Sequence, residues 1–182
     1  MKRKFAATLV LAVLAGCASA PAPRYYTLDM RASGQAEAPV NILVGHIRVA
    51  EALGRKNILI QKNPTEVEYY ALDEWVAGLD ELIRLKLEGE FGPYREERPS
   101  VKIDVSVLAF EQVDSGLGAE ASVSLAVTFY EQGQDASGTP APERRYDIRE
   151  AAAGANAAEV VRTLSRGIET AALRIAADTA AL

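Results

Sequence analysis

Apolar and polar residues alternate in two stretches in the middle of the chain, at 101–109 and 121–129. A period of two is typical of β-strands that bury one face and expose the other. The link at 114–118 is rich in serine and glycine, which favours a tight turn. The sequence therefore predicts an antiparallel hairpin, after which a polar loop at 132–142 leads into a third strand at 144–150.

Two further stretches repeat apolar residues at steps of three and four, which is the period of an amphipathic helix. The first helix is expected from near Asp73 to position 90, with Asp73 or a neighbour as its cap and Trp75 near the edge of its apolar face. That face is expected to contain Val76, Leu79, Leu82, Ile83 and Leu87. The second helix is expected to begin after Asn156, which has a glutamate three residues later as in a capping box, and to reach almost to Leu182.

Shorter apolar segments precede the first helix and are expected to be strands, at 24–28, 41–49, 58–61 and 66–70. The segment at 41–49 is apolar enough for a strand that is buried on both faces. Strands, a helix, a strand meander and a second helix then follow one another along the chain. This order predicts the α+β class: a two-layer sandwich in which two long helices pack on one face of a mostly antiparallel or mixed β-sheet.

The first residues have the layout of a secretory signal peptide, with three basic residues, an apolar run and then small residues. The apolar run from Phe5 to Ala15 is too short to cross a bilayer, which needs about 20 residues. The run ends in Leu14-Ala15-Gly16-Cys17, which resembles the lipobox of bacterial lipoproteins. In such proteins the peptide is cut before the cysteine, and the thiol receives a diacylglycerol.

This layout divides the chain into a signal peptide at 1–16, an acylated cysteine with its tether at 17–24, and a single periplasmic domain at 25–182. Ordinary cleavage after Ala20 is the alternative, but a proline would follow that cut and generally blocks it. Cys17 is the only cysteine, so the domain forms no internal disulfide. Two or more acyl chains hold a protein durably at a bilayer, and we therefore expect a stable membrane anchor.

Acidic residues outnumber basic ones by 25 to 20, which gives the chain a net charge of −5. Removal of the signal peptide takes away three basic residues and leaves 17 against 25, a net charge of −8. Such a surface argues against nucleic acid as a partner, because phosphate binding depends on lysine and arginine. It also argues against broad adhesion to anionic lipid, so the lipid anchor is expected to supply the membrane contact.

Residue types that carry catalysis or bind metals are scarce. The mature chain has one cysteine, expected to be lipidated, one histidine and no Gly-x-Ser-x-Gly elbow. His46 lies within the expected strand at 41–49, which favours a core or edge position over a catalytic base. The sequence shows no cluster with metal-ligand spacing and no glycine-rich phosphate loop. It therefore predicts a protein that is not an enzyme and that uses no cofactor or metal.

Residues 42–91 resemble the ABC-type transport auxiliary lipoproteins, a family that includes paraquat-inducible protein C. The segment YYTLD at 25–29 is similar to the family's first strand as well. The positions that match the family's motifs are Ile47, Val49, Leu53, Arg55, Ile58, Val67, Tyr69, Trp75, Leu79, Asp80 and Ile83. Gly54 and Glu74 depart from the family, in which aspartate and arginine are common at these two places.

The resemblance implies a non-catalytic subunit of an Mce-type system for intermembrane phospholipid transport. In such systems an ABC ATPase and a permease lie in the inner membrane, and an Mce-domain protein bridges the periplasm. The lipoprotein would dock on this bridge, with a ring of identical copies as a further possibility. Ala18 and Ser19 favour sorting to the periplasmic face of the outer membrane, because an aspartate after the cysteine is the usual signal for inner-membrane retention.

Four residues are candidates for the partner interface: Arg48, Arg55, Tyr70 and Trp75. Aromatic side chains are typical interface anchors, but Tyr69, Tyr70 and Trp75 have an alternative role in which they cover the junction between helix and sheet. Two other functions stay open. One is an envelope-integrity or outer-membrane assembly lipoprotein, and the other is an envelope hydrolase that uses a pair of carboxylates.

Overall fold

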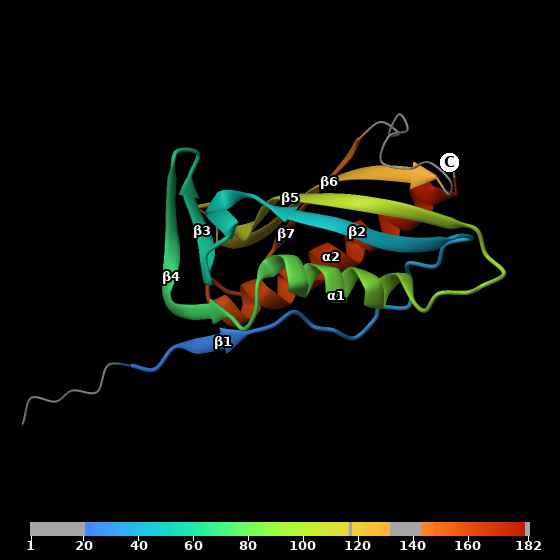
Figure 1. Cartoon of the computed structure of the whole chain (residues 1–182). Helices are drawn as coiled ribbons and strands as arrows, with labels where there is room; N and C mark the ends of the chain where they lie inside the picture. Colours follow the sequence, from blue (N-terminus) through green and yellow to red (C-terminus); the bar gives the residue numbers. More distant parts are fainter. Residues whose placement is uncertain (1–20, 117, 132–142, 181–182) are drawn as a thin grey trace, which may run out of the picture.

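Two layers make up the molecule: a twisted sheet, and the helices α1 (Leu79–Phe91) and α2 (Ala157–Thr179), which pack against one of its faces (Figure 1). The computed structural model describes residues 21–116, 118–131 and 143–180. Within these residues the sheet has 7 strands in the order β1-β4-β3-β5-β6-β7, and β2 pairs with β5 beside this path. The α+β class and the placement of both helices on one face are thereby confirmed.

The second half of the sheet is an antiparallel meander of long strands. Its strands are β5 (Ser100–Asp114), β6 (Ala119–Glu131) and β7 (Arg144–Ala151). The predicted alternation is confirmed up to a bulge after Val107 in β5, because the apolar side chains that face the helices are buried. In β7 the buried Tyr146 and Ile148 alternate with the exposed side chains of Arg145, Asp147 and Arg149. The predicted turn is confirmed by a hydrogen bond from the Ser115 amide to the Gly118 carbonyl, and the loop at 132–142 lies outside the described residues.

The first half of the sheet is built mostly from strands that pair with distant parts of the chain. Its strands are β1 (Arg24–Tyr26), β2 (Asn41–Val49), β3 (Asn57–Asn63) and β4 (Glu66–Trp75). β3 and β4 form an antiparallel hairpin, whereas β1 is parallel to β4, and β2 and β3 are both parallel to β5. Figure 1 shows this hairpin at one end of the sheet, where β4 turns a corner before it meets β1.

The structure corrects the prediction that the strand at 41–49 is buried on both faces. Among the described strands β2 pairs only with β5, and after its first residue its side chains are half-buried or exposed, with His46 exposed. The guanidinium of Arg84 in α1 donates hydrogen bonds to the carbonyls of Val44 and Gly45, at 2.9 and 2.7 Å. Carbonyls of an edge strand otherwise attract another chain, so Arg84 protects this part of β2.

The first helix begins later than predicted, at Leu79 rather than near Asp73. Asp73 and Trp75 belong to the end of β4, because the Trp75 amide donates a hydrogen bond across to the segment before β3, and Gly78 is the N-cap. Val76 is 60% exposed and does not join the apolar face, whereas the other four residues predicted for that face are buried. Apolar residues at the end of β4 have, by chance, a helical spacing with those of α1. The pairing of β4 with distant segments determined where the strand ends and the helix begins.

The second helix starts as predicted and packs closely on the sheet. The side-chain oxygen of Asn156 accepts a hydrogen bond from the Glu159 amide at 3.1 Å, which confirms the predicted cap. A Cβ atom at Gly167 would lie 2.6 Å from Cγ2 of Val123 in β6. The absence of a side chain at Gly167 therefore sets how near α2 approaches the sheet.

Candidate functional site

The candidate interface residues are not all accessible in the folded protein. Arg48 and Arg55 are exposed, but Trp75 is 2% exposed and packs against a phenylalanine of β5 with ring centroids 5.7 Å apart. Tyr70 is half-buried and donates a hydrogen bond to the side chain of Gln112. These contacts agree with the alternative in which the aromatic residues cover the junction in the core. Contact of these residues with a partner stays a prediction.

The two exposed arginines lie in different places. Arg48 alternates along β2 with Ile47 and Val49, which pack against the core, and it therefore points to the opposite face. Arg55 follows the short 3-10 helix η1 (Glu51–Leu53) that comes after β2. The predicted anchor and sorting residues, Cys17, Ala18 and Ser19, lie outside the described residues.

A shallow groove of about 260 Å³ lies between the end of β2 and the start of α1, and we call it the motif groove. Six of the residues in the family motifs line it: Ile47, Val49, Leu53, Arg55, Leu79 and Asp80. The aliphatic residues are buried or half-buried, whereas Arg55 and Asp80 are exposed. The groove is open and smaller than a typical pocket for a drug-sized ligand, so its form suits side chains of a protein partner better than an enclosed small molecule.

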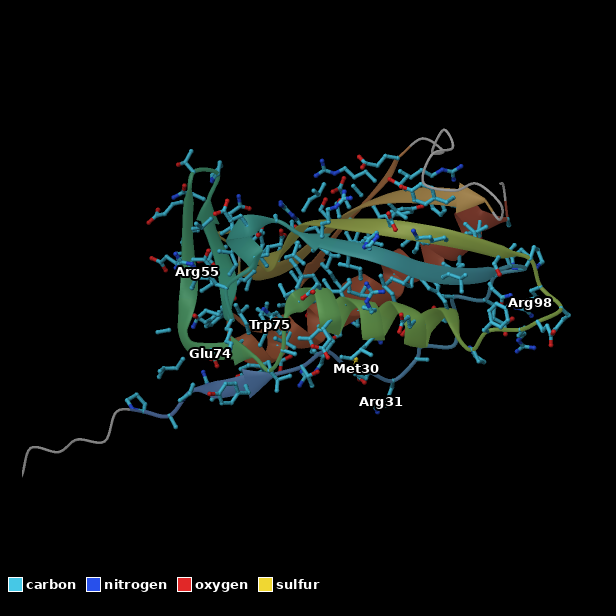
Figure 2. The ribbon with its side chains drawn as sticks, in the orientation of Figure 1. Met30, Arg31, Arg55, Glu74, Trp75 and Arg98 are labelled. Atoms are coloured by element: carbon cyan, nitrogen blue, oxygen red, sulfur yellow. The ribbon has the colours of Figure 1, made fainter. Side chains whose placement is uncertain are left out.

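Arg55 is held at the rim of the motif groove by the hairpin. Its guanidinium carbon lies 4.6 Å from the centroid of the Tyr69 ring, and the Tyr69 hydroxyl donates a hydrogen bond to the carbonyl of Ala52 at 2.9 Å. A cation–π contact at an exposed site is worth about 0.5–1 kcal/mol, which is enough to bias the orientation of the side chain. Figure 2 shows Arg55, Glu74 and Trp75 at one end of the molecule and Arg98 at the other.

The first strand is fastened to the corner of β4 by a two-point ion pair. Arg24 Nε lies 2.7 Å from Asp73 Oδ1, and Arg24 Nη2 donates to Asp73 Oδ2 at 2.9 Å. The Asp73 side chain is buried, and its hydrogen bonds and charge raise the pKa of Arg24. This pair fixes the point at which the predicted tether enters the domain.

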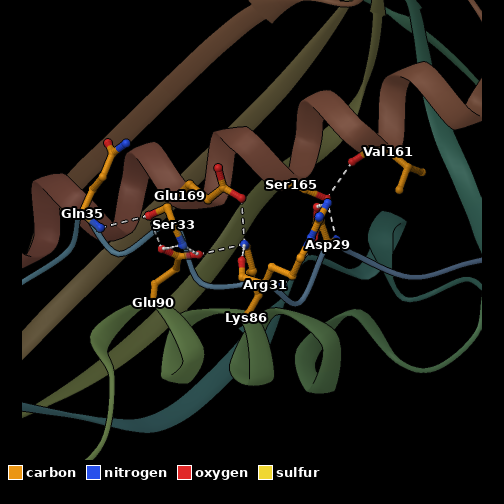
Figure 3. Close-up of polar contacts among 9 residues, drawn as sticks. All are labelled: Asp29, Arg31, Ser33, Gln35, Lys86, Glu90, Val161, Ser165 and Glu169. Carbon is orange, nitrogen blue, oxygen red and sulfur yellow. Dashed lines mark hydrogen bonds and ion pairs between the residues drawn. The ribbon is translucent and has the colours of Figure 1, made fainter.

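The connection from β1 to β2 runs lengthwise between the two helices, and we call residues 28–38 the strap (Figure 3). Leu28 and Ala36 of the strap are buried in the core. Between them, the Asp29 amide donates a hydrogen bond to the Ser165 hydroxyl of α2 at 3.1 Å. The strap therefore covers the seam between α1 and α2.

A buried lysine holds the strap and both helices together. The ammonium of Lys86 is 1% exposed and donates at 2.8 Å to the Arg31 carbonyl, to Glu90 and to Glu169, which satisfies its three protons. Glu90 also accepts hydrogen bonds from the amide and hydroxyl of Ser33. A buried charge needs such pairing, because desolvation otherwise costs several kcal/mol per ion. We call these five residues the latch.

The latch stays ionised near neutral pH. Burial acts to lower the pKa of Lys86, but its hydrogen bonds to Glu169 and Glu90 outweigh burial and place the pKa above the ordinary value. Burial acts to raise the pKa of Glu90, and here the bonds from Lys86 and Ser33 outweigh it and lower the pKa. Both shifts favour the charged pair, so the latch stabilises the fold and is poorly suited to exchange protons at neutral pH.

Sequence reasoning overlooked the latch, although a signal was present. Lys86 and Glu90 are four residues apart, and both lie on the same helical face as Ile83 and Leu87. Charged residues on a face that packs into the core indicate a buried pair. The partners on the strap and α2 could not be inferred, because they are distant in sequence.

No group of three or more histidine, cysteine, aspartate or glutamate side chains among the described residues could hold a metal ion. Neither described helix combines the length and apolarity needed to cross a membrane.

Comparisons with known proteins bear on the family and the fold. A family model described as "ABC-type transport auxiliary lipoprotein component" matches residues 26–176. A crystal structure of a protein from Xanthomonas campestris, assigned to the DUF330 family, has a TM-score of 0.68 and 14% identity and covers 86% of this chain and 94% of its own. A crystal structure of an uncharacterized protein has a TM-score of 0.64 and 16% identity and covers 87% of this chain and 99% of its own. No curated protein is significantly similar in sequence.

Proposed function

Because the chain belongs to the family of ABC-type transport auxiliary lipoproteins, we propose that it is a non-catalytic docking subunit of an intermembrane phospholipid transporter. In this proposal Cys17 carries the lipid anchor at the periplasmic face of the outer membrane. The domain binds the Mce-domain protein that bridges the periplasm. The protein thereby holds the outer end of the transporter at the outer membrane, and it catalyses no chemical step.

The motif groove is the observation that carries this proposal. Residues that match the family motifs are spread from Ile47 to Asp80 in the chain, yet six of them line one accessible surface. An apolar floor with a charged rim is typical of the centre of a protein interface. Arginine is among the most frequent interface hot spots, and Arg55 is already oriented by Tyr69, which lowers the entropy lost on binding.

A photo-crosslinking experiment tests the docking surface. A photoreactive amino acid replaces Lys56, which is exposed and lines the motif groove beside Arg55, and a matched variant carries it at Leu173, which is exposed on α2. Irradiation of cells that produce the full chain is expected to give an adduct with an Mce-domain protein from position 56 but not from position 173. Adducts only with outer-membrane assembly factors would support the alternative function instead.

The same pair of positions tests for a ring of identical copies. An adduct of the protein with itself at position 56 would mean that the motif groove binds a neighbouring copy. An adduct with the Mce-domain protein would mean that the groove binds that partner. The copies in a ring would then have to contact one another through a different surface. Mass spectrometry of the adducts distinguishes these results.

A charge reversal tests whether Arg55 contributes to affinity. Arg55→Glu is expected to reduce recovery of the Mce-domain protein in a pull-down by about tenfold or more, as is usual for a hot-spot arginine. Arg162→Glu is the control, because Arg162 is exposed on α2 and its ion pair among the described residues is with Glu159 of the same helix. Equal recovery with both variants would remove the motif groove from the proposal.

The lipid anchor has a separate test. Radioactive palmitate is expected to label the full chain, and Cys17→Ser is expected to abolish the label. Globomycin, which inhibits the lipoprotein signal peptidase, is expected to make the unprocessed form accumulate. Normal processing in its presence would contradict anchoring at Cys17, whatever the outcome of the crosslinking. Separation of inner and outer membranes then tests the predicted sorting by Ala18 and Ser19.

A further inference from the structure

Large apolar side chains are exposed at several places among the described residues. Leu43 and Tyr94 line one shallow pocket at the end of α1. The others away from β1 come from separate elements: Met30, Val67, Leu85, Leu108 and Leu173. Single exposed apolar residues are ordinary on protein surfaces. Tyr25 and Val76 differ, because they are 61% and 60% exposed and lie side by side: Tyr25 is in β1, and Val76 directly follows the end of β4 that pairs with β1.

The pairing of β1 with β4 places these two side chains on one surface. Tyr25 is level with Glu74 in a parallel register, and the amide of Val76 continues the ladder by donating to the Tyr26 carbonyl at 2.9 Å. Side chains alternate along a strand, so Tyr26 and the buried Trp75 face the domain. Tyr25, Glu74 and Val76 consequently face outward, and we call them the outer patch.

The outer patch lies next to the point where the predicted tether enters. Tyr25 is eight residues after Cys17, a span of at most about 28 Å when extended. Because the ion pair between Arg24 and Asp73 fixes β1 to the domain, the patch cannot move away from the anchor independently.

We propose that the outer patch rests on the surface of a zwitterionic phospholipid bilayer and so fixes the orientation of the domain. This proposal rests on the lipid anchor of the proposed function. Tyrosine suits the interface, since its ring enters the apolar boundary while its hydroxyl stays in water. The charge beside the ring on this face is the carboxylate of Glu74, because Arg24 alternates with Tyr25 and pairs with Asp73. A carboxylate is repelled by an anionic surface but tolerated by a zwitterionic one, whose headgroups carry an ammonium.

A second protein is a poorer fit for this surface. A stable protein interface buries about 800 Å² on each partner, which is far more than two apolar side chains provide. A membrane contact needs less, because the acyl chains supply the attachment and the patch has only to favour one orientation. The motif groove, which Ala77 and Gly78 border just beyond Val76, is then held near the bilayer.

Depth measurement with a spin label tests this orientation without removing the patch. Thr27 is exposed and follows Tyr25 on the outward face, so a nitroxide on Thr27→Cys reports on the patch. In the lipidated full chain the thiol of Cys17 is already consumed, which leaves the introduced cysteine as the single reactive one. The protein is reconstituted in vesicles of phosphatidylcholine and phosphatidylethanolamine, with Leu173→Cys on α2 as the matched control.

The expected result is that the label at position 27 collides more with oxygen than with a water-soluble nickel chelate, whereas the label at position 173 shows the reverse. Adding Tyr25→Ser and Val76→Ser is expected to abolish the difference, and both positions are exposed enough for the fold to persist. Equal access of nickel to both labels would overturn the proposal, as would immobilisation without oxygen access, which indicates a protein contact. Failed anchoring shows separately, as protein that does not float with the vesicles.

Discussion

The two halves of the sheet are assembled in different ways. In the second half, β5, β6 and β7 pair in chain order, and the side that faces α2 is mainly apolar. In the first half, β1, β2 and β3 each have a parallel neighbour far along the chain. Buried charged groups accompany this half, namely Asp73 at the corner of β4, and Lys86 and Glu90 under the strap.

The difference follows from how much each kind of contact specifies. Apolar packing fixes which face of a strand turns inward, and a tight turn then fixes the register of neighbouring strands. Apolar packing and tight turns do not determine the position of the strap or of the three-residue strand β1. The buried carboxylate of Asp73 has to meet the guanidinium of Arg24, and the buried ammonium of Lys86 has to meet its three acceptors, so each of these contacts selects one position.

Removal of the latch lysine should therefore have the largest effect on stability. Lys86→Met leaves Glu90 buried without its counter-charge and is expected to lower the free energy of unfolding by about 3–5 kcal/mol. The control in the second half is Lys102→Met, since Lys102 is exposed and forms a loose 3.7 Å pair with Asp104. It is expected to cost less than about 1 kcal/mol. Urea denaturation measures the free energy of unfolding of both variants. Similar losses in the two would contradict the proposed difference between the halves of the sheet.

Apolar packing in the second half is probed at the contact of α2 with β6. Gly167→Ala places a Cβ atom 2.6 Å from Val123 Cγ2. We expect a net loss of about 1–2 kcal/mol, because the strain exceeds the gain in helix propensity. A second change, Val123→Ala, is expected to remove that strain, so the two effects should not add. If the stability losses of the two single variants, measured by thermal unfolding, add up to that of the double variant, then the structure accommodates the Cβ atom without strain at Val123.

A smaller effect is expected from the polar contact between β4 and β5. Tyr70→Phe removes the hydrogen bond to Gln112 and is expected to cost about 0.5–1.5 kcal/mol. Burial raises the pKa of Tyr70 to about 12, so in the native protein this tyrosine should ionise well above the usual value of 10.0. Ultraviolet titration of the wild type and the variant measures this directly. A wild-type curve with no delayed tyrosine would contradict the buried placement.

The smallest effect is a change in the pH dependence of stability. The pKa of Glu90 is lower in the folded protein than its ordinary value of 4.5, so the unfolded chain takes up the proton first as the pH falls. Its contribution is complete above about pH 4.5 and is lost as the pH falls through the lowered pKa. The stability difference between wild type and Glu90→Gln is therefore expected to shrink below pH 4.5. A stability difference that does not change with pH would mean that the charge of Glu90 does not contribute to stability.

The sequence was a good guide to the candidate site only in part. The family motifs include six of the residues that line the motif groove, but Trp75 is buried in the core, and Arg48 faces away from the groove. Lys56, which also lines the groove, had no signal in the sequence. Several elements form the groove together. The sequence alone therefore cannot distinguish residues that line the groove from residues that are buried beneath it.

What the sequence determined by itself was the local structure with a clear period. The alternation in β5 and β6, the turn between them, and the start of α2 at Asn156 depend on neighbouring residues, and these predictions are confirmed. The resemblance of residues 42–91 also gave the family correctly.

Only the tertiary structure decided the end of β4, the exposure of β2 and the course of the strap. Asp73 and Trp75 have a helical spacing with the residues that follow, yet pairing with β1 and the segment before β3 keeps them in a strand. Lys86 belongs to the core only because the strap and α2 supply its acceptors. Such contacts join residues far apart in the chain, and local preferences of less than about 1 kcal/mol per residue are too weak to oppose them.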